Sequence, residues 1–253
     1  MKDYSLKIGW LYPDLMSTYG DRGNVIVLQK RCEWRDIEVK ILKIDEHTND
    51  QDMKTIDILF GGGAQDREQK IVIENLNKKK QILHDLIEKN VPSLFVCGSP
   101  QLFGKYYEPE EGKRIEGLGI FDMISKHPGI NHPRLIGNVI ARAQIHGLED
   151  ITIVGFENHG GRTYLGSNAR PFAKIIKGNG NNGEDSSEGV IYKNAIGSYF
   201  HGPLLPKNPE IADWLISKAL DVKYKKSVTL KDPDDTLSRT AKSTIAKRLG
   251  IKL

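Results

Sequence analysis

The segment that most constrains the fold is residues 91–104, VPSLFVCGSPQLFG. Its first half is a short apolar run typical of a buried strand, and this run ends at Cys97. Gly98 and small residues follow, and then a helix-like segment begins. A cysteine on a sharp strand-to-helix turn forms a nucleophile elbow, where the helix N-terminus lowers the thiol pKa and favours the reactive thiolate. An isolated cysteine more often only fills core space, and this segment alone leaves both interpretations open.

The composition of the chain limits the classes of protein to which it can belong. The chain has 253 residues, enough for one large α/β domain or two small ones, and its hydrophobic and charged fractions of 38% and 28% are ordinary for a globular protein. The net charge of +4 comes without a clustered basic face, so we expect no nucleic-acid partner. The two cysteines, Cys32 and Cys97, favour free thiols in a reducing cytoplasm, and no Cys/His spacing indicates a metal site.

Membrane insertion is not expected. The first residues lack the apolar stretch of a signal peptide, and no run approaches the roughly 20 apolar residues of a membrane span. A membrane-linked role would therefore come through a substrate or a partner.

The first hundred residues alternate between strand-like and helix-like segments. The expected strands are 6–12, 38–44, 56–60 and 91–96, and the expected helices are 25–36 and 66–90, the second capped by Asp66. This order predicts a mostly parallel central sheet with helices on both faces.

The character changes after residue 107. Short strands are expected at 117–121, 135–144, 151–156, 172–177, 190–192 and 195–200, followed by an amphipathic helix at 208–220. We therefore predict one domain over residues 1–222 and a basic tail over 223–253 that contains one short helix, and basic tails are usually solvated.

A glycine loop follows the expected strand 56–60. Gly61, Gly62 and Gly63 would let the backbone approach a ligand closely and direct its N–H groups at an anion. The loop matches neither a Walker sequence nor a dinucleotide fingerprint, and a turn without chemical function is an equally good interpretation.

A cysteine nucleophile needs a base, usually a histidine distant in sequence. His159 and His201 are the candidates among the seven histidines, because each accompanies a strand end. His201 ends an apolar strand at the edge where open parallel sheets form their sites, so it is the predicted base.

Taken in order, these motifs resemble those of class I (triad-type) glutamine amidotransferases, in the branch of the cobyric acid synthase glutaminase domains. The resemblance rests on three motifs: a strand followed by Gly-Gly-Gly, the sequence Cys-Gly-x-x-Gln, and a late strand that ends in His. The stretches 60–69, 155–164, 178–182 and 201–208 are similar to the glutaminase subunits of lipid II isoglutaminyl synthases. The resemblance covers about residues 5–220 and implies a flavodoxin-like fold.

The resemblance also implies roles for the reacting groups. Cys97 would attack the side-chain amide of L-glutamine and release ammonia, leaving a thioester. His201 would activate the thiol, protonate the ammonia and then activate the hydrolytic water. Backbone N–H groups near Gly62 or Gly63, and at Gly98, would stabilise the oxyanion.

Two further residues enter through the resemblance. Arg134 matches the arginine that holds the α-carboxylate of glutamine, for which a guanidinium fork is suited. Gln101 belongs to the cysteine motif and is assigned to the substrate site.

A partner is implied because free ammonia would be lost to water and no ATP-binding signature occurs in the chain. By resemblance the partner is a MurT-like Mur ligase in a heterodimer. That ligase would hold ATP and magnesium, so no cofactor is expected in this chain. It would amidate the D-glutamate of the lipid II stem peptide to D-isoglutamine at the inner face of the membrane, in peptidoglycan synthesis.

The chain departs from the family pattern at three places, of which one is the tail over residues 223–253, which has no counterpart in the matched motifs. Ser99 and Pro100 stand where the elbow usually carries glycine and an aromatic residue, and Pro203 stands where many members have a glutamate after the histidine. A Cys-His dyad, or a third acid from the partner, is therefore implied. A non-catalytic scaffold subunit and a different cysteine hydrolase on the same fold remain alternatives.

Overall fold

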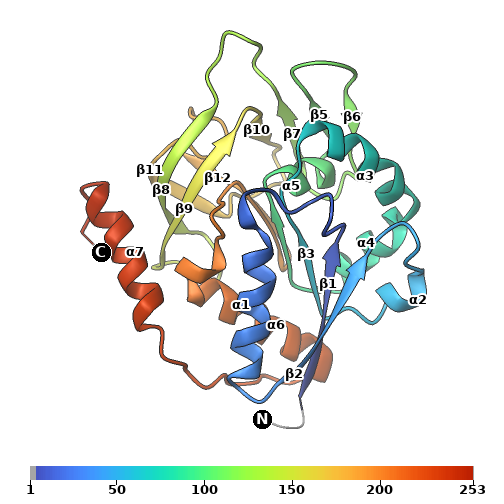
Figure 1. The fold of residues 1–253 in the computed structure, drawn as a ribbon, viewed down its shortest axis with the longest axis vertical. Coiled ribbons are helices and arrows are strands. Elements are labelled where there is room, and N and C mark those ends of the chain that lie inside the picture. Colours follow the sequence, from blue (N-terminus) through green and yellow to red (C-terminus); the bar gives the residue numbers. More distant parts are fainter. Residues whose placement is uncertain (1–3, 253) are drawn as a thin grey trace.

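A computed structural model describes residues 4–252 and shows a central six-stranded sheet (Figure 1). Its strand order is β13-β14-β4-β3-β1-β2, in which β13 pairs antiparallel with β14 and the other pairs are parallel. The predicted mostly parallel α/β sheet is therefore confirmed. The strands are β1 (Ser5–Leu11), β2 (Glu38–Ile44), β3 (Ile58–Gly61), β4 (Ser93–Val96), β13 (Val190–Tyr192) and β14 (Ala195–Ser198).

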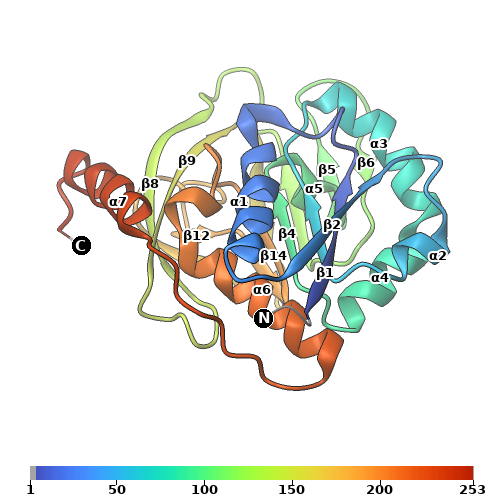
Figure 2. The same ribbon diagram turned by 60° about the horizontal axis from the view of Figure 1, so that its bottom comes forward.

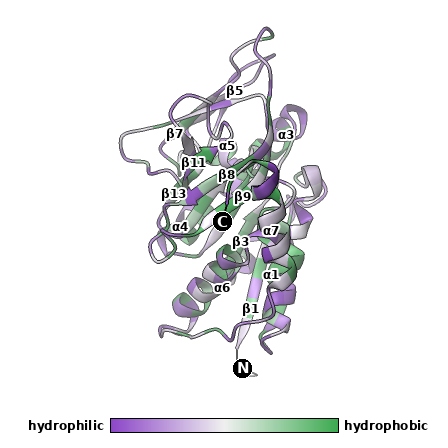
Figure 3. Cartoon of the chain, turned by 90° about the vertical axis from the view of Figure 1, so that its left-hand side faces the viewer, coloured by the Kyte–Doolittle hydropathy of each residue, from purple (hydrophilic) through white to green (hydrophobic). Residues whose placement is uncertain are grey.

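Helices cover both faces of this sheet (Figures 1 and 2). Consecutive residues of β3 face opposite sides, since Ile58 and Phe60 join one buried cluster and Leu59 joins the other. A strand buried on both faces is nearly continuous in apolar residues, as β3 and β4 are, whereas the edge strand β2 alternates and is partly exposed. The hydrophobic colouring lies mainly on interior elements (Figure 3). One cluster includes residues of α1 (Arg22–Glu33) and α6 (Pro209–Tyr224), and the other includes residues of α2 (Asp50–Met53), α3 (Asp66–Lys78), α4 (Lys80–Glu88) and α5 (Gly98–Phe103).

The helix expected over 66–90 is two helices, which meet at Lys79 with a non-helical φ of −101° and ψ of 6°. The expected cap was also wrong, because Gln65 occupies the N-cap position. Asp66 lies in the first turn and accepts a 3.0 Å hydrogen bond from the hydroxyl of Tyr107. The short helix α2, whose N-cap is Asn49, was not expected.

Two four-stranded sheets form the rest of the domain, with orders β10-β7-β5-β6 and β12-β11-β8-β9. Their strands at 135–144, 151–156 and 172–177 agree with the sequence within a few residues, but β5, β6, β7, β10 and β12 were not expected. The bounds are β5 (Tyr106–Glu108), β6 (Ile115–Glu116), β7 (Met123–Lys126), β8 (Leu135–Ala143), β9 (Thr152–His159), β10 (Arg162–Leu165), β11 (Ala173–Lys177) and β12 (Ser187–Glu188).

The strand predicted at 117–121 is absent, because this segment follows the end of α5 instead of a neighbouring strand. The N–H of Leu118 donates to the carbonyl of Leu102, and the N–H groups of Ile120 and Phe121 donate to that of Phe103. These bonds satisfy carbonyls that the end of a helix leaves unpaired. An apolar run over a helix end therefore looked like a strand in sequence.

The C-terminal tail contains one helix, α7 (Thr236–Arg248), as expected, but the tail is not simply solvated. Ala246 packs against Ile140 and Val154 on β8 and β9. Figure 2 shows α7 beside β8. The buried guanidinium of Arg31 binds Asp235 of the tail at 2.6 Å. None of the helices within residues 4–252 has the length and apolar character needed to cross a membrane.

The packing of Gly155 on β9 yields a stability prediction. An added Cβ there would lie 2.5 Å from Cγ of Phe200, so Gly155→Ala should lower the free energy of unfolding by about 1–3 kcal/mol. Gly137→Ala on β8, where nothing lies within 4 Å of the new methyl group, is the control and should change it by less than about 0.5 kcal/mol. Urea unfolding measures both, and equal stability of the two variants would contradict this packing.

Candidate active site

Cys97 occupies a strained turn between β4 and α5. Its φ of 53° and ψ of −97° are unusual for a residue with a side chain, and its N–H donates to the carbonyl of Ser198 at 2.8 Å. Strained backbone of this kind persists where the surrounding structure enforces it, often at functional sites. The thiol is partly exposed, whereas Cys32 is buried in the core, where burial raises its pKa to about 12. The elbow predicted from sequence is therefore present.

Ser99, an apparent defect of the elbow, is bonded into it. Its hydroxyl donates a 2.6 Å hydrogen bond to the carbonyl of Gly62, and both residues are buried. A Cβ at Gly61 would lie 2.5 Å from this hydroxyl, so that glycine makes room for the serine. The serine consequently joins the elbow to the glycine loop.

His201 lies just beyond β14 and is fully buried. Its backbone pairs with Phe156 of β9 through both N–H and C=O, which fixes the ring direction. A Cβ at Gly63 would lie 3.1 Å from Cε1 of His201 and 3.3 Å from Cβ of Cys97, so the glycine loop passes directly beside both residues. The structure therefore brings the predicted nucleophile and base together.

Asp21 adds a buried carboxylate that sequence reasoning missed. Its Oδ1 lies 3.2 Å from Nδ1 of His201, and its Oδ2 accepts the N–H of Gly63 at 2.7 Å. Burial lowers the pKa of His201, but the negative charges of Cys97 and Asp21 outweigh it and raise that pKa overall. The carboxylate beside this histidine comes from the loop before α1, whereas Pro203 led us to expect a dyad or an acid from the partner, and that expectation stays a prediction. The only sequence signal was an acid in the loop just before the first helix.

The oxyanion donors also differ from expectation at one position. The N–H of Gly63 is engaged by Asp21, so it is not directed at the substrate. Gly98 begins α5 and approaches Ala64, whose N would lie 2.9 Å from a Cβ at that position. At Gly62 a Cβ would lie 2.3 Å from the carbonyl oxygen of Met16, so this glycine is required for packing.

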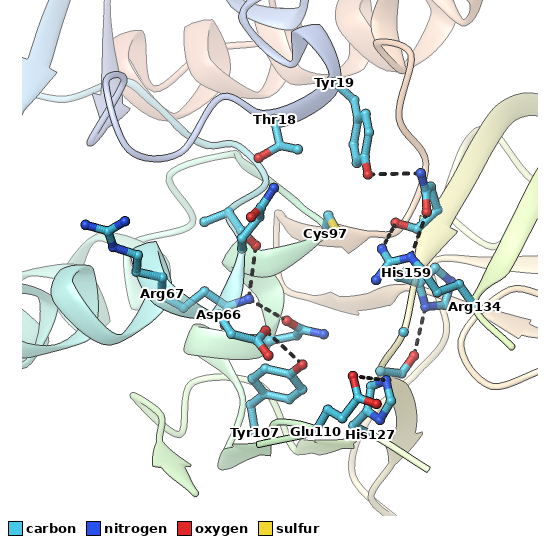
Figure 4. Close-up of a pocket in the computed structure, with 17 residues that line it drawn as sticks. Thr18, Tyr19, Asp66, Arg67, Cys97, Tyr107, Glu110, His127, Arg134 and His159 are labelled. Carbon is cyan, nitrogen blue, oxygen red and sulfur yellow. Dashed lines mark hydrogen bonds and ion pairs between the residues drawn. The ribbon is translucent and has the colours of Figure 1, made fainter. Parts of the chain in front are cut away.

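Arg134 faces the elbow across a cavity of about 440 Å³ that both residues line (Figure 4). Its Nε and Nη2 donate to the side-chain and backbone oxygens of Asn158, at 3.0 and 2.9 Å. Nη1 makes no hydrogen bond within the described part of the chain. The site thus places a fixed cation across the cavity from a thiol.

Gln101 lies at the buried side of this cavity. Its Oε1 accepts from Gln69 at 2.9 Å, and its Nε2 donates to the hydroxyl of Tyr199 at 3.1 Å. Both amide ends are used in these contacts, so Gln101 supports the wall of the cavity. Its assignment as a substrate-binding residue stays a prediction.

His159 also lines the cavity and is held as a neutral ring. It stacks on Tyr199 with centroids 4.0 Å apart, and its Nδ1 lies 2.8 Å from the carbonyl oxygen of Gly161. Burial lowers its pKa to about 3. The carboxylate contact distinguishes His201 as the better base, since no acidic side chain is hydrogen-bonded to His159 among residues 4–252.

A comparison with known protein families identifies the family of this domain. Residues 7–209 match the family model of the CobB/CobQ-like glutamine amidotransferase domain. The chain belongs to this family. The resemblance seen in the sequence is therefore confirmed, and the cysteine elbow, glycine loop and strand-end histidine are features of a glutamine amidotransferase domain.

Two curated relatives are each 41% identical to this chain. One is the GatD subunit of a lipid II isoglutaminyl synthase (glutamine-hydrolyzing) from Streptococcus pneumoniae, matched over 93% of this chain and 88% of the relative. The other is the same subunit from Staphylococcus aureus, matched over 87% and 86%. Among solved structures, a Trypanosoma brucei CTPS glutaminase domain with bound acivicin has a TM-score of 0.56 at 13% identity, covering 89% of this chain and 96% of that one. That likeness shows the fold alone.

The hydroxyl of Ser99 gives a prediction for the elbow. Ser99→Ala leaves the buried Gly62 carbonyl without its donor, so the free energy of unfolding should fall by about 1–3 kcal/mol and glutamine hydrolysis should slow. Ser93→Ala is the matched control, because it removes a buried hydroxyl bonded to the carbonyl of Val91 at the start of β4. Urea unfolding and glutamate release are measured for both. Hydrolysis slowed equally in the two variants would show that the Ser99 contact has no specific effect on the elbow.

Proposed function

We propose that this chain is the glutamine-hydrolysing subunit of a lipid II isoglutaminyl synthase. The observation that carries the proposal is Cys97 on its elbow, with Arg134 across the cavity (Figure 4) and His201 beside the glycine loop that passes the elbow. The substrate class comes from the family, and the specific synthase from the two relatives that share 41% identity.

The substrate, L-glutamine, spans the cavity from Arg134 to Cys97. The free face of the Arg134 guanidinium binds the α-carboxylate of L-glutamine, with Asn158 holding the other two nitrogens. This fixes the backbone end of the substrate on the wall opposite the elbow. The side-chain amide then extends toward Sγ of Cys97, which is the near-attack arrangement the reaction requires.

Hydrolysis proceeds in two halves. Nε2 of His201 takes the thiol proton, Sγ of Cys97 bonds to the amide carbon, and the oxyanion is stabilised by the N–H of Gly98 at the start of α5. The imidazolium returns its proton to the amide nitrogen, the C–N bond breaks, and ammonia leaves a thioester. His201 then deprotonates a water that attacks the thioester, which releases L-glutamate and restores the thiol.

The released ammonia requires an acceptor enzyme. We assign that role to a MurT-like Mur ligase in a heterodimer with this chain, with ATP and magnesium on the ligase. The ligase amidates the D-glutamate of the lipid II stem peptide to D-isoglutamine, at the inner face of the membrane. This chain itself takes no cofactor and contacts lipid II only through its partner.

The nucleophile is tested by Cys97→Ser in the complex with the partner ligase. Glutamate release from glutamine should fall by at least about 10³-fold, because serine cannot replace the thiolate. Cys32→Ser, whose side chain is buried in the core, should retain the activity apart from a small loss of stability. Wild-type complex that releases no glutamate would favour a scaffold subunit, and an active Cys97→Ser complex would contradict the assignment of Cys97.

Arg134→Ala tests the substrate contact separately. Removing a charge-assisted carboxylate contact should raise the KM for glutamine about 10- to 100-fold and affect kcat less. Arg142→Ala, an exposed arginine further along β8, is the control and should leave KM unchanged. Steady-state kinetics with L-glutamine decide the question. An unaltered KM in Arg134→Ala would remove Arg134 from this role.

A further inference from the structure

Asp21 carries a buried charge that local structure does not require. It occupies the N-cap position of α1, but its side chain makes no capping hydrogen bond to that helix. The residue is fully buried, and a buried carboxylate is costly unless it is paired and hydrogen-bonded. The contacts that stabilise this carboxylate therefore lie away from the helix, within the active site.

Those contacts use both oxygens. Oδ1 lies 3.2 Å from Nδ1 of His201, and Oδ2 accepts the N–H of Gly63 at 2.7 Å. One carboxylate thus connects the base with the glycine loop that passes Cys97. Because Nδ1 faces an acceptor-only group, the neutral ring carries its proton on Nδ1 and leaves a lone pair on Nε2.

Nε2 of His201 is free to act on the thiol. It is buried and has no hydrogen-bond partner in residues 4–252, while the imidazole interacts electrostatically with Cys97. The other titratable groups near the ring are Tyr19, whose ring contacts it edge-on at 5.0 Å between centroids, and the neutral His159. Lys207 is turned away from the ring, onto the backbone carbonyls of Gly202 and Pro203. Asp21 is therefore the carboxylate hydrogen-bonded to this base.

The chain after His201 is packed against the helix that Asp21 begins. A Cβ at Gly23 would lie 2.5 Å from the ring of Pro203, so the proline lies flat on the first turn of α1. The side chain of Asn24 accepts the N–H of Leu205 at 2.9 Å. Pro203, which replaces the usual acid, thus helps to bring the start of α1 beside the base.

From these contacts we propose that Asp21 is the third acid of the glutaminase centre and acts as a positioning residue. It sets the tautomer of His201, stabilises the imidazolium that forms when the thiol loses its proton, and holds the glycine loop against the elbow. The acid is supplied by this chain, so the centre needs no carboxylate from the partner. This inference rests on the proposed glutaminase function.

Asp21→Asn is the discriminating variant. Asparagine has one acceptor where aspartate has two, so either Nδ1–H of His201 or the N–H of Gly63 loses its partner. In the complex with the partner ligase, kcat for glutamine hydrolysis should fall by about 10²- to 10⁴-fold, with KM changed less than about 3-fold. A carboxylate raises the pKa of a neighbouring imidazolium, so its removal lowers that pKa, and the high-pH limb of the rate profile should move to lower pH. Asp21→Glu, which keeps both acceptors, should recover part of the rate.

Asp213→Asn is the matched control. Asp213 is a carboxylate that binds Arg31 and Arg35 near the other end of α1, so its loss disturbs the packing of the same helix without touching His201. It should leave the position of the high-pH limb unchanged. An Asp21→Asn complex with near-normal kcat, or with an unmoved limb, would overturn the proposal in favour of a dyad or a partner acid.

Two measurements do not depend on glutamine turnover. Alkylation of Cys97 by iodoacetamide against pH reports the thiolate directly, and in Asp21→Asn thiolate formation should require higher pH; Cys97→Ser gives the background. Imidazole ¹⁵N NMR of the wild-type complex reads the tautomer of His201 without any variant. A proton on Nδ1 supports the proposal, and a proton on Nε2 in the neutral ring contradicts it. If glutamine is not hydrolysed while both measurements agree with this proposal, the proposed glutaminase function fails, and only the positioning of His201 by Asp21 stands.

Discussion

The active site depends on the parallel pairing of β4 with β14. Val96 lies opposite Ser198 in the register, and the next N–H along, that of Cys97, donates to the carbonyl of Ser198. Parallel neighbours end at the same edge of a sheet, so the residues that follow the two strands are brought together although about a hundred positions separate them. The position of His201 is therefore set by the strand that precedes it, and no separate loop is needed to place it.

This dependence explains what could be predicted from the sequence. Cys97, His201 and the glycine loop each follow an apolar strand, which is a local signal, and the rule that sites form at the carboxyl edge then joins them. Arg134 had no such signal, since it precedes β8 in a polar loop, and only the family resemblance indicated it. The first half of the fold was predictable for the same reason, because buried parallel strands are continuous apolar runs.

The parts that could not be predicted depend on contacts between distant polar groups. Asp21 lies 180 positions from His201, and an acid beside a helix start has a sufficient local explanation as a capping residue. Ser99 looked like a disturbance of the turn until its hydrogen bond to Gly62 was seen. The strands β5 and β7 have three and four residues with mixed polar and apolar side chains, too few for a periodic pattern to indicate a strand. In each case the structural role depends on a contact with a residue that is not a neighbour in the sequence.

Tyr19 shows that the positions of the proposed base, His201, and the proposed substrate contact, Arg134, are not independent. It lies two residues before Asp21, in a backbone conformation with φ of 54°, and its ring packs edge-on against His201. Its hydroxyl accepts a 2.9 Å hydrogen bond from Asn158, whose oxygens hold the guanidinium of Arg134. One short segment thus contacts the imidazole of His201 through Asp21 and, through Tyr19, the Asn158 side chain that holds Arg134. Tyr19 and Arg134 both line the cavity in Figure 4. Because a misplacement of either group would weaken the proposed catalysis, a single strained turn that contacts both groups couples the position of His201 to that of Arg134.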